Sequence, residues 1–220
     1  MATTILFDPQ QLPIDAIAGE AAVAPERLRP DWLRRRFADP PPWVPEAADE
    51  SRQRGPRTTR ASVLVPLVLR EEGVTMLLTL RTAHLSKHGG QVSFPGGRAE
   101  PDDASAIDTA LRESEEEVGL ARRHVEVLGT LPDYHTITGF CVTPVVALVT
   151  PPFDLRADPN EVAEIFEVPL AFLMDGLNHQ RLSSVLPEGR RSFYAMPYDR
   201  FYIWGATAGM LRNLFHFLRA

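Results

Sequence analysis

The stretch FPGGRAEPDDASAIDTALRESEEEVGL, residues 94–120, joins a two-glycine turn to a segment with four closely spaced glutamates. Apolar residues recur in it every three or four positions, which predicts a helix over about 104–118. Candidate N-cap oxygens come from Asp102, Asp103 and Ser105, and Gly119 supplies a left-handed stop. The stripe of this helix that faces the core is expected to consist of Ile107, Ala110, Leu111, Ser114 and Val118.

Three of the four glutamates, Glu113, Glu116 and Glu117, fall on one edge of the predicted helix, whereas Glu115 points elsewhere into solvent. Like charges at this spacing repel each other, and the helix macrodipole disfavours them near the C-terminal end. A hard divalent cation such as Mg²⁺ or Mn²⁺ would offset that repulsion. The alternative is a solvated acidic face without a ligand, which a glutamate-rich helix alone would favour.

The turn and the helix together resemble the signature of the Nudix hydrolase family. That signature is a glycine, five residues, a glutamate, seven residues, then Arg-Glu-apolar-any-Glu-Glu-any-Gly-apolar. Two positions depart from it: Asp103 stands at the first glutamate, with eight residues instead of seven between it and Arg112, and Ser114 replaces an apolar residue. The extra residue falls in a loop or first helical turn, where insertions are tolerated. The residues that match are Gly97, Arg112-Glu113, Glu116-Glu117 and Gly119-Leu120.

The resemblance implies a role for each matched residue. Glu116 and Glu117 would be the main metal ligands, aided by the carbonyl group of Gly96. Glu113 would bind a second cation or help to activate water, and Arg112 would orient a glutamate. The catalytic residues would then be Arg112, Glu113 and Glu117, and water would attack one phosphorus of a pyrophosphate. A more distant general base is also implied, with Glu161 and Glu164 as candidates, although either could be an ordinary surface glutamate.

Residues 77–97, LLTLRTAHLSKHGGQVSFPGG, resemble the additional signature of the coenzyme A pyrophosphatase branch. Segments 136–144 and 202–208 are similar to parts of that branch as well. Ser86 stands where the branch has an arginine, and a serine cannot replace a charged guanidinium beside a phosphate. The substrate-binding residues implied are Arg81, Gly90 and Gly97.

The resemblance therefore implies hydrolysis of coenzyme A or acyl-CoA to 3′,5′-ADP and (acyl-)4′-phosphopantetheine. One alternative is a Nudix hydrolase of ADP-ribose, NADH or nucleoside triphosphates, which the absence of an arginine at Ser86 favours. The other is a non-catalytic regulatory module that binds a nucleotide. The retained glutamates argue against that module, because a binding role alone does not require them.

Composition restricts the partners of the chain. The formal net charge of −6 argues against a nucleic-acid partner. No apolar run approaches the roughly 20 residues that span a bilayer, and no signal peptide is evident. Cys141 is the only cysteine, which excludes an internal disulfide and, with the preceding points, predicts a cytoplasmic protein. The oligomeric state stays open between a monomer and a homodimer.

The order of elements predicts an α+β fold, and the resemblance implies a Nudix-type α/β/α sandwich with a mixed β-sheet. Residues 56–220 are expected to form the Nudix domain. Residues 1–55 are expected to be an N-terminal extension, with a short helix in 25–37 and a proline-rich linker over 39–50. The other predicted elements are strands in 60–69, 74–81, 125–131, 142–150 and 164–170, a brief strand at 92–94, a short helix in 169–177, a hairpin over 191–205 and a helix over 206–218.

Overall fold

The computed structural model describes residues 8–46, 58–85, 88–186 and 189–220. Its helices are α1 (Pro30–Ala38), α2 (Ala106–Val118), α3 (Leu170–Leu173) and α4 (Gly205–Arg219). Its strands are β1 (Ile14–Ile17), β2 (Thr59–Arg70), β3 (Gly73–Arg81), β4 (Val92–Ser93), β5 (Gly96–Arg98), β6 (Val125–Thr130), β7 (Tyr134–His135), β8 (Phe140–Val149), β9 (Val162–Pro169), β10 (Gln180–Leu186), β11 (Gly189–Tyr198) and β12 (Phe201–Trp204). None of the helices in the described part of the chain is both long and apolar enough to cross a membrane.

Eight of these strands form one large sheet, which positions the candidate site. Its main path runs β4-β3-β2-β8-β6, and β5, β7 and β9 pair with β2, β8 and β3, respectively. β2 and β8 are parallel, whereas the other pairs are antiparallel. The predicted α+β fold with a mixed sheet is therefore confirmed.

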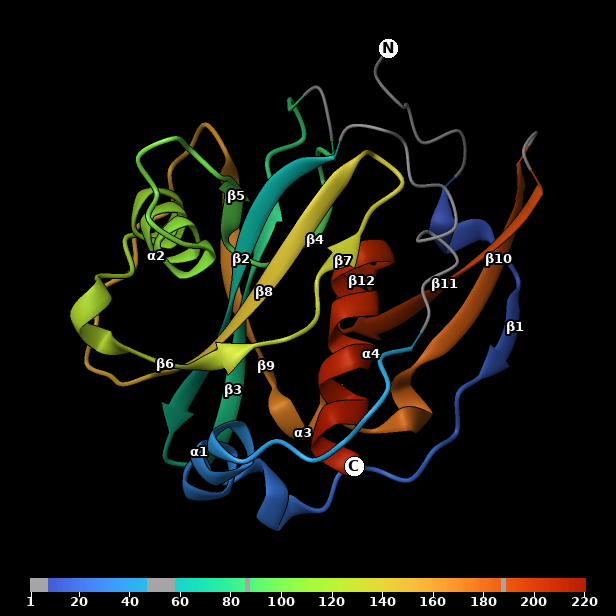
Figure 1. Ribbon diagram of the computed structural model, residues 1–220. Helices are drawn as coiled ribbons and strands as arrows, with labels where there is room; N and C mark the ends of the chain where they lie inside the picture. The colour runs from blue at the N-terminus through green and yellow to red at the C-terminus, as the bar shows by residue number, and fades with distance from the viewer. Residues whose placement is uncertain (1–7, 47–57, 86–87, 187–188) are drawn as a thin grey trace.

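Helices cover both faces of the large sheet (Figure 1). On one face, α2 packs over Leu64, Val68 and Leu77. On the other face, α4 lies between the large sheet and a second sheet (Figure 1), and its side chains share a core with Leu67 and Leu78. Side chains of β2 and β3 alternate between these two cores because successive residues of a strand point to opposite faces.

A second sheet of four strands, in the order β1-β10-β11-β12, was not predicted. The sequence indicated only the β11–β12 hairpin. β10, with the sequence QRLSSVL, has a mixed polar pattern, and all four residues of β1 are exposed. Neither strand carries a strong local signal, so their pairing depends on the surrounding fold.

The N-terminal residues 8–46 pack along the rest of the chain. β1 pairs with β10, and the predicted short helix is present as α1, preceded by a 3₁₀ turn. Leu33 of α1 is fully buried in the same core as α4. The predicted boundary between extension and domain, at residue 55, falls in the segment 47–57 outside the described residues and stays a prediction.

Candidate functional site

Ser105 and Gly119, two of the residues that the sequence indicated as helix ends, cap α2. The Ser105 hydroxyl caps the N-terminus by accepting from the Asp108 N–H group at 3.1 Å. Gly119 ends the helix with φ +71°, and its N–H donates to the Glu115 carbonyl at 3.1 Å. Ser114 lies on the buried stripe, where its hydroxyl donates to the Ala110 carbonyl at 2.7 Å. These ends fix which residues lie on each face of α2.

Strand β5 lies between β2 and α2, and its two glycines permit that close approach. Gly96 has φ +152°, and a Cβ atom there would overlap the Ser62 carbonyl oxygen and the Val63 backbone. At Gly97 a Cβ atom would overlap the carboxylate of Glu113. Only glycine therefore fits at positions 96 and 97, where β5 meets Glu113 and Glu117 of α2.

Glu117 is the most enclosed carboxylate of the site, with 5% of its side chain exposed. Its Oε2 accepts from the Gly96 N–H group at 3.0 Å, and its Oε1 lies 3.6 Å from Nη1 of Arg81. Burial raises the pKa of Glu117 to about 8, although the Gly96 hydrogen bond and the Arg81 charge oppose the rise. A buried carboxylate with one short hydrogen bond is short of donors, so a bound cation would stabilise its charged form.

Arg112 joins three other carboxylates. Its Nε and Nη2 donate to the two oxygens of Asp103 at 2.9 and 3.0 Å. Its Nη1 donates to Glu116, one helical turn further on, at 2.9 Å, and its Nη2 lies 3.1 Å from Glu113. Asp103 also accepts from the hydroxyl of the fully buried Thr109, a contact that the sequence did not indicate. The aspartate at the first glutamate position thus reaches Arg112 despite the extra residue.

The three glutamates of the predicted edge differ in exposure. Glu117 is buried, Glu113 is mostly buried, and Glu116 has 60% of its side chain exposed. Burial raises the pKa of Glu113, and the charge of Arg112 opposes that rise. Glu115 is exposed, as predicted. The helical wheel therefore identified the edge correctly, but it could not rank the glutamates by burial.

The two general-base candidates lie on opposite faces of the large sheet. Glu161 lies 3.6 Å from Arg81, the same arginine that approaches Glu117. Glu164 forms an ion pair with Arg200. A bulge in β9 separates them, because Leu80 pairs with Glu164 whereas Arg81 pairs with Val162. Only Glu161 is on the α2 side, where its negative charge helps to raise the pKa of Glu117.

The loop after β3 is closed by backbone hydrogen bonds next to Arg81. The Arg81 N–H donates to the Gln91 carbonyl at 2.9 Å, and the Gly90 N–H donates to the Arg81 carbonyl at 3.1 Å. Gly90 has φ +73°, a conformation that favours glycine. Ser86 and Lys87 lie in this loop but outside the described residues.

The chemistry of the site suits a hard divalent cation. Five carboxylates meet only two guanidinium groups, which leaves an excess of negative charge: Asp103, Glu113, Glu116, Glu117 and Glu161 against Arg81 and Arg112. Within the described ranges, no three His, Cys, Asp or Glu side chains already converge on one point. Several carboxylate oxygens contact Arg112, so a bound cation would replace some of these contacts with metal–oxygen bonds. The donor set, all oxygen and net negative, nevertheless fits Mg²⁺ or Mn²⁺.

Comparison with known proteins finds a matching family model, relatives in sequence and a similar solved structure. The family model described as NUDIX domain matches residues 58–188. The chain is 43% identical over 155 residues to "Uncharacterized Nudix hydrolase NudL" of Escherichia coli K12, with 70% of this chain and 80% of that protein covered. The protein of the same name from Shigella boydii serotype 18 is 42% identical over the same length and with the same coverage. Among solved structures, the Nudix hydrolase RenU from M. smegmatis is 25% identical, with a TM-score of 0.45 and coverage of 59% of this chain and 80% of that one.

Proposed function

The chain belongs to the NUDIX domain family, and from that premise we propose that it is a metal-dependent pyrophosphatase that hydrolyses coenzyme A or its acyl thioesters. Water would attack one phosphorus and break its bond to the bridging oxygen, which yields 3′,5′-ADP and (acyl-)4′-phosphopantetheine. The observation that carries the proposal is the buried Glu117 carboxylate, held against Gly96 beside Arg81 and short of hydrogen-bond donors.

The cation would be held by Glu113, Glu116, Glu117 and the Gly96 carbonyl. A bound Mg²⁺ or Mn²⁺ supplies charge neutralisation at the phosphates and lowers the pKa of a coordinated water. The residues of the chain itself hold the glutamates in position. Gly96 fixes one oxygen of Glu117 by hydrogen bonding, and Gly97 leaves the space that the Glu113 carboxylate occupies.

Arg112 would orient the glutamates rather than touch the substrate. Its guanidinium group is anchored at Asp103 by two hydrogen bonds, and its remaining donors face Glu113 and Glu116. A planar guanidinium group with several fixed partners restricts the rotation of each. Arg112 and Asp103 thereby act through the glutamates on the reacting groups.

Glu161 is the residue we propose as general base. It shares the α2 side of the sheet with Glu117, and both approach Arg81 at 3.6 Å. Glu164 is a natural control, because it lies three positions away and pairs with Arg200 on the opposite face. Glu161→Gln should lower kcat about 100-fold or more, whereas Glu164→Gln should retain it. Equal losses in both variants would contradict the assignment.

Coenzyme A is favoured as substrate by the matches across residues 77–97, of which the matched residues Arg81, Gly90 and Gly97 lie around the site. Arg81 approaches two of the carboxylates, Gly90 closes the neighbouring loop, and Gly97 lines the surface below Glu113. ADP-ribose, NADH or a nucleoside triphosphate is the second candidate, because Ser86 replaces the arginine of the coenzyme A signature.

A substrate panel tests the proposal. The purified protein is incubated with Mg²⁺ or Mn²⁺ and, in parallel, with coenzyme A, acetyl-CoA, ADP-ribose, NADH and nucleoside triphosphates, and products are separated by chromatography. We expect release of 3′,5′-ADP mainly from coenzyme A and its thioester, and loss of activity with a chelator. Preference for ADP-ribose would overturn the substrate assignment. Nucleotide binding without turnover of any compound would instead favour the regulatory module.

A further inference from the structure

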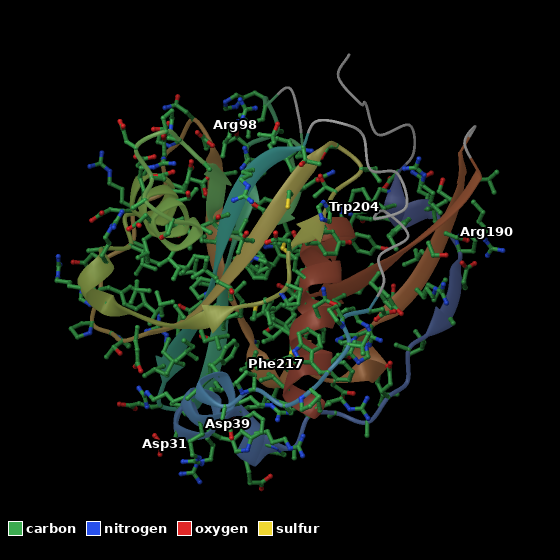
Figure 2. The ribbon with its side chains drawn as sticks, in the orientation of Figure 1. Asp31, Asp39, Arg98, Arg190, Trp204 and Phe217 are labelled. Carbon is green, nitrogen blue, oxygen red and sulfur yellow. The ribbon has the colours of Figure 1, made fainter. Side chains whose placement is uncertain are left out.

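Arg98, the last residue of β5, combines a fixed backbone with an exposed side chain that forms no ion pair with the described residues. Its carbonyl oxygen accepts from Nη2 of Arg112 at 3.2 Å, which ties the backbone to the carboxylate edge. Its side chain is exposed, and the guanidinium carbon lies 5.9 Å from the ring centroid of Phe140. Figure 2 shows Arg98 at the top of the molecule, where β5 ends.

The two other arginines of the site already face carboxylates. Arg81 lies between Glu117 and Glu161, and Arg112 faces Asp103 and the remaining glutamates. Arg98, in contrast, has no carboxylate within ion-pair distance among the described residues. An unpaired arginine beside an acidic edge leaves a positive charge available to an anionic ligand.

The face of β5 that Arg98 occupies indicates which anionic group it could meet. Gly97 lies against Glu113, so its neighbour Arg98 points to the opposite face, since strand residues alternate. This agrees with the register, in which Arg98 pairs with Ala61, a residue of the core on the α4 side. The side chain therefore lies across the strand from the carboxylate edge and would contact a phosphate other than one held at that edge.

The contact with Phe140 favours a ready-made phosphate site. A guanidinium group over an aromatic ring is restricted in orientation, which lowers the entropy lost on binding. Arginine also recognises phosphate through two parallel N–H donors. We propose that Arg98 binds a phosphate group of the substrate on the far side of β5, namely the 3′-phosphate of the coenzyme A ribose. This rests on the proposed function, because among the candidate substrates coenzyme A is the one with a phosphate monoester on its ribose, separate from the phosphate chain that is cleaved.

The test compares coenzyme A with 3′-dephospho-coenzyme A in Arg98→Ala, Arg98→Lys and the control Arg29→Ala. Arg29 is also exposed, and it precedes α1 close in sequence to Asp31, which lies at the opposite end of the molecule (Figure 2). We expect Arg98→Ala to raise KM for coenzyme A about 10- to 100-fold with little change in kcat, because one charge-assisted contact is lost. Arg98→Lys should recover part of the loss, and Arg29→Ala should behave as the unsubstituted protein.

The dephospho substrate identifies the phosphate. Its KM should be high in the unsubstituted protein and nearly unchanged by Arg98→Ala. An equal loss on both substrates would keep Arg98 as a phosphate ligand and assign it to the pyrophosphate. No change with either substrate, at an unchanged melting temperature, would overturn the proposal.

A binding measurement separates this inference from the proposed function. Calorimetry with 3′,5′-ADP and with 5′-AMP needs no turnover, so it remains informative if coenzyme A is not cleaved. We expect 3′,5′-ADP to bind more tightly than 5′-AMP, and Arg98→Ala to remove most of that difference. The same affinities in the variant and the unsubstituted protein would show that Arg98 binds no 3′-phosphate, whatever the enzyme hydrolyses.

Discussion

Two helices of this protein each carry an arginine surrounded by acidic groups, but the two clusters differ in their supply of donors. On α4, Arg212 donates to Glu20 and Glu46, and it contacts two histidines. At α2, Arg112 of the helix and Arg81 of β3 face five carboxylates, which together form the α2 cluster: Asp103, Glu113, Glu116, Glu117 and Glu161. The difference separates a cluster that stabilises the fold from one that can accept a cation.

The pKa values of one carboxylate in each cluster express this difference. Burial opposes the ionisation of Glu46, but hydrogen bonds from His216, Tyr194 and Arg212 outweigh it and lower its pKa to about 2. Burial raises the pKa of Glu117 to about 8, because a single short N–H contact does not compensate. Burial alone therefore does not indicate a candidate functional carboxylate, whereas burial without sufficient donors does.

The α2 cluster can be broken by one substitution in its most buried member. Glu117→Gln should lower kcat at least about 1,000-fold, or about 4 kcal/mol of activation free energy, because the amide removes the charge that a cation needs. Thermal stability should be unchanged or higher, since a poorly solvated carboxylate is lost. Steady-state kinetics and thermal melts of the same sample measure both.

Glu115→Gln is the matched control for that variant, because Glu115 is exposed on the same helix. It should leave both kcat and the melting temperature unchanged. Full activity in Glu117→Gln would show that the donor-poor carboxylate of α2 has no catalytic role.

The α4 cluster should respond in stability instead. Arg212 has 3% of its side chain exposed, so Arg212→Met would leave Glu20 and Glu46 without their common partner. We expect the free energy of unfolding to fall by about 3 kcal/mol. Activity per folded molecule should persist, which chemical denaturation and active-site titration together would establish.

A surface pair provides the comparison for Arg212. Arg34 bridges to Glu126 with 40% of its side chain exposed, and Arg34→Met should cost less than about 1 kcal/mol. Similar losses in the two variants would mean that the α4 cluster contributes no more than an exposed ion pair.

The α4 cluster should also contribute to the pH dependence of stability, in the direction opposite to the raised pKa of Glu117. His179 is fully buried: its Nε2–H donates to the Leu173 carbonyl at 2.8 Å, and its Nδ1 accepts from Arg212 at 3.0 Å. Burial lowers its pKa from 6.5 to about 4. Between these values the unfolded chain binds a proton that the folded protein does not, so stability falls as the pH falls from 6.5 to 4.

Measured by urea denaturation in the Glu117→Gln variant, which removes the opposing contribution of the Glu117 carboxylate, the loss should reach about 2 kcal/mol between pH 7 and pH 4.5. His179→Gln should flatten this interval, whereas the same change at the exposed His84 should not. Below about pH 4.5, Glu46 adds a further loss as the pH approaches 2, because its charged form stabilises the fold. An unaltered pH profile in His179→Gln would refute the assignment.

The smallest effect is expected at the anchor of Arg112. Asp103→Asn keeps the size of the side chain but removes the charge that holds two guanidinium nitrogens. We expect kcat to fall about tenfold while KM is retained, because the glutamates would be less well oriented rather than lost. Kinetics on the substrate identified by the panel measure this change. A loss confined to KM would place Asp103 in substrate binding.

The sequence predicted the α2 edge well because local signals determine it. Ser105 and Gly119 set the ends of the helix, and a 3.6-residue period places Glu113, Glu116 and Glu117 together. The same local reasoning could not choose between Glu161 and Glu164. Glu161 lies in the turn before β9 and Glu164 within that strand, and only their ion pairs, with Arg81 and Arg200, show that they lie on different sides of the sheet.

Long-range contacts account for what the sequence did not indicate. Glu20 and Glu46 reach Arg212 across more than 160 residues, and no periodicity connects such distant positions. β1 and β10 were missed for the same reason, because β1 has no buried face and depends on its neighbour for order. Asp103 is an intermediate case: its sequence position suggested a role, but only the geometry shows that the shorter side chain reaches Arg112.

The packing of the N-terminal residues has a practical consequence for dissecting this protein. The family match begins at residue 58 and ends at residue 188, but the core extends beyond both limits. Leu33 of α1 and Leu214 of α4 share that core, and Glu20 compensates the buried charge of Arg212. The segment that matches the family is thus smaller than the unit that folds, and a fragment cut at residues 58 and 188 would expose apolar surface and keep only β10 of the second sheet.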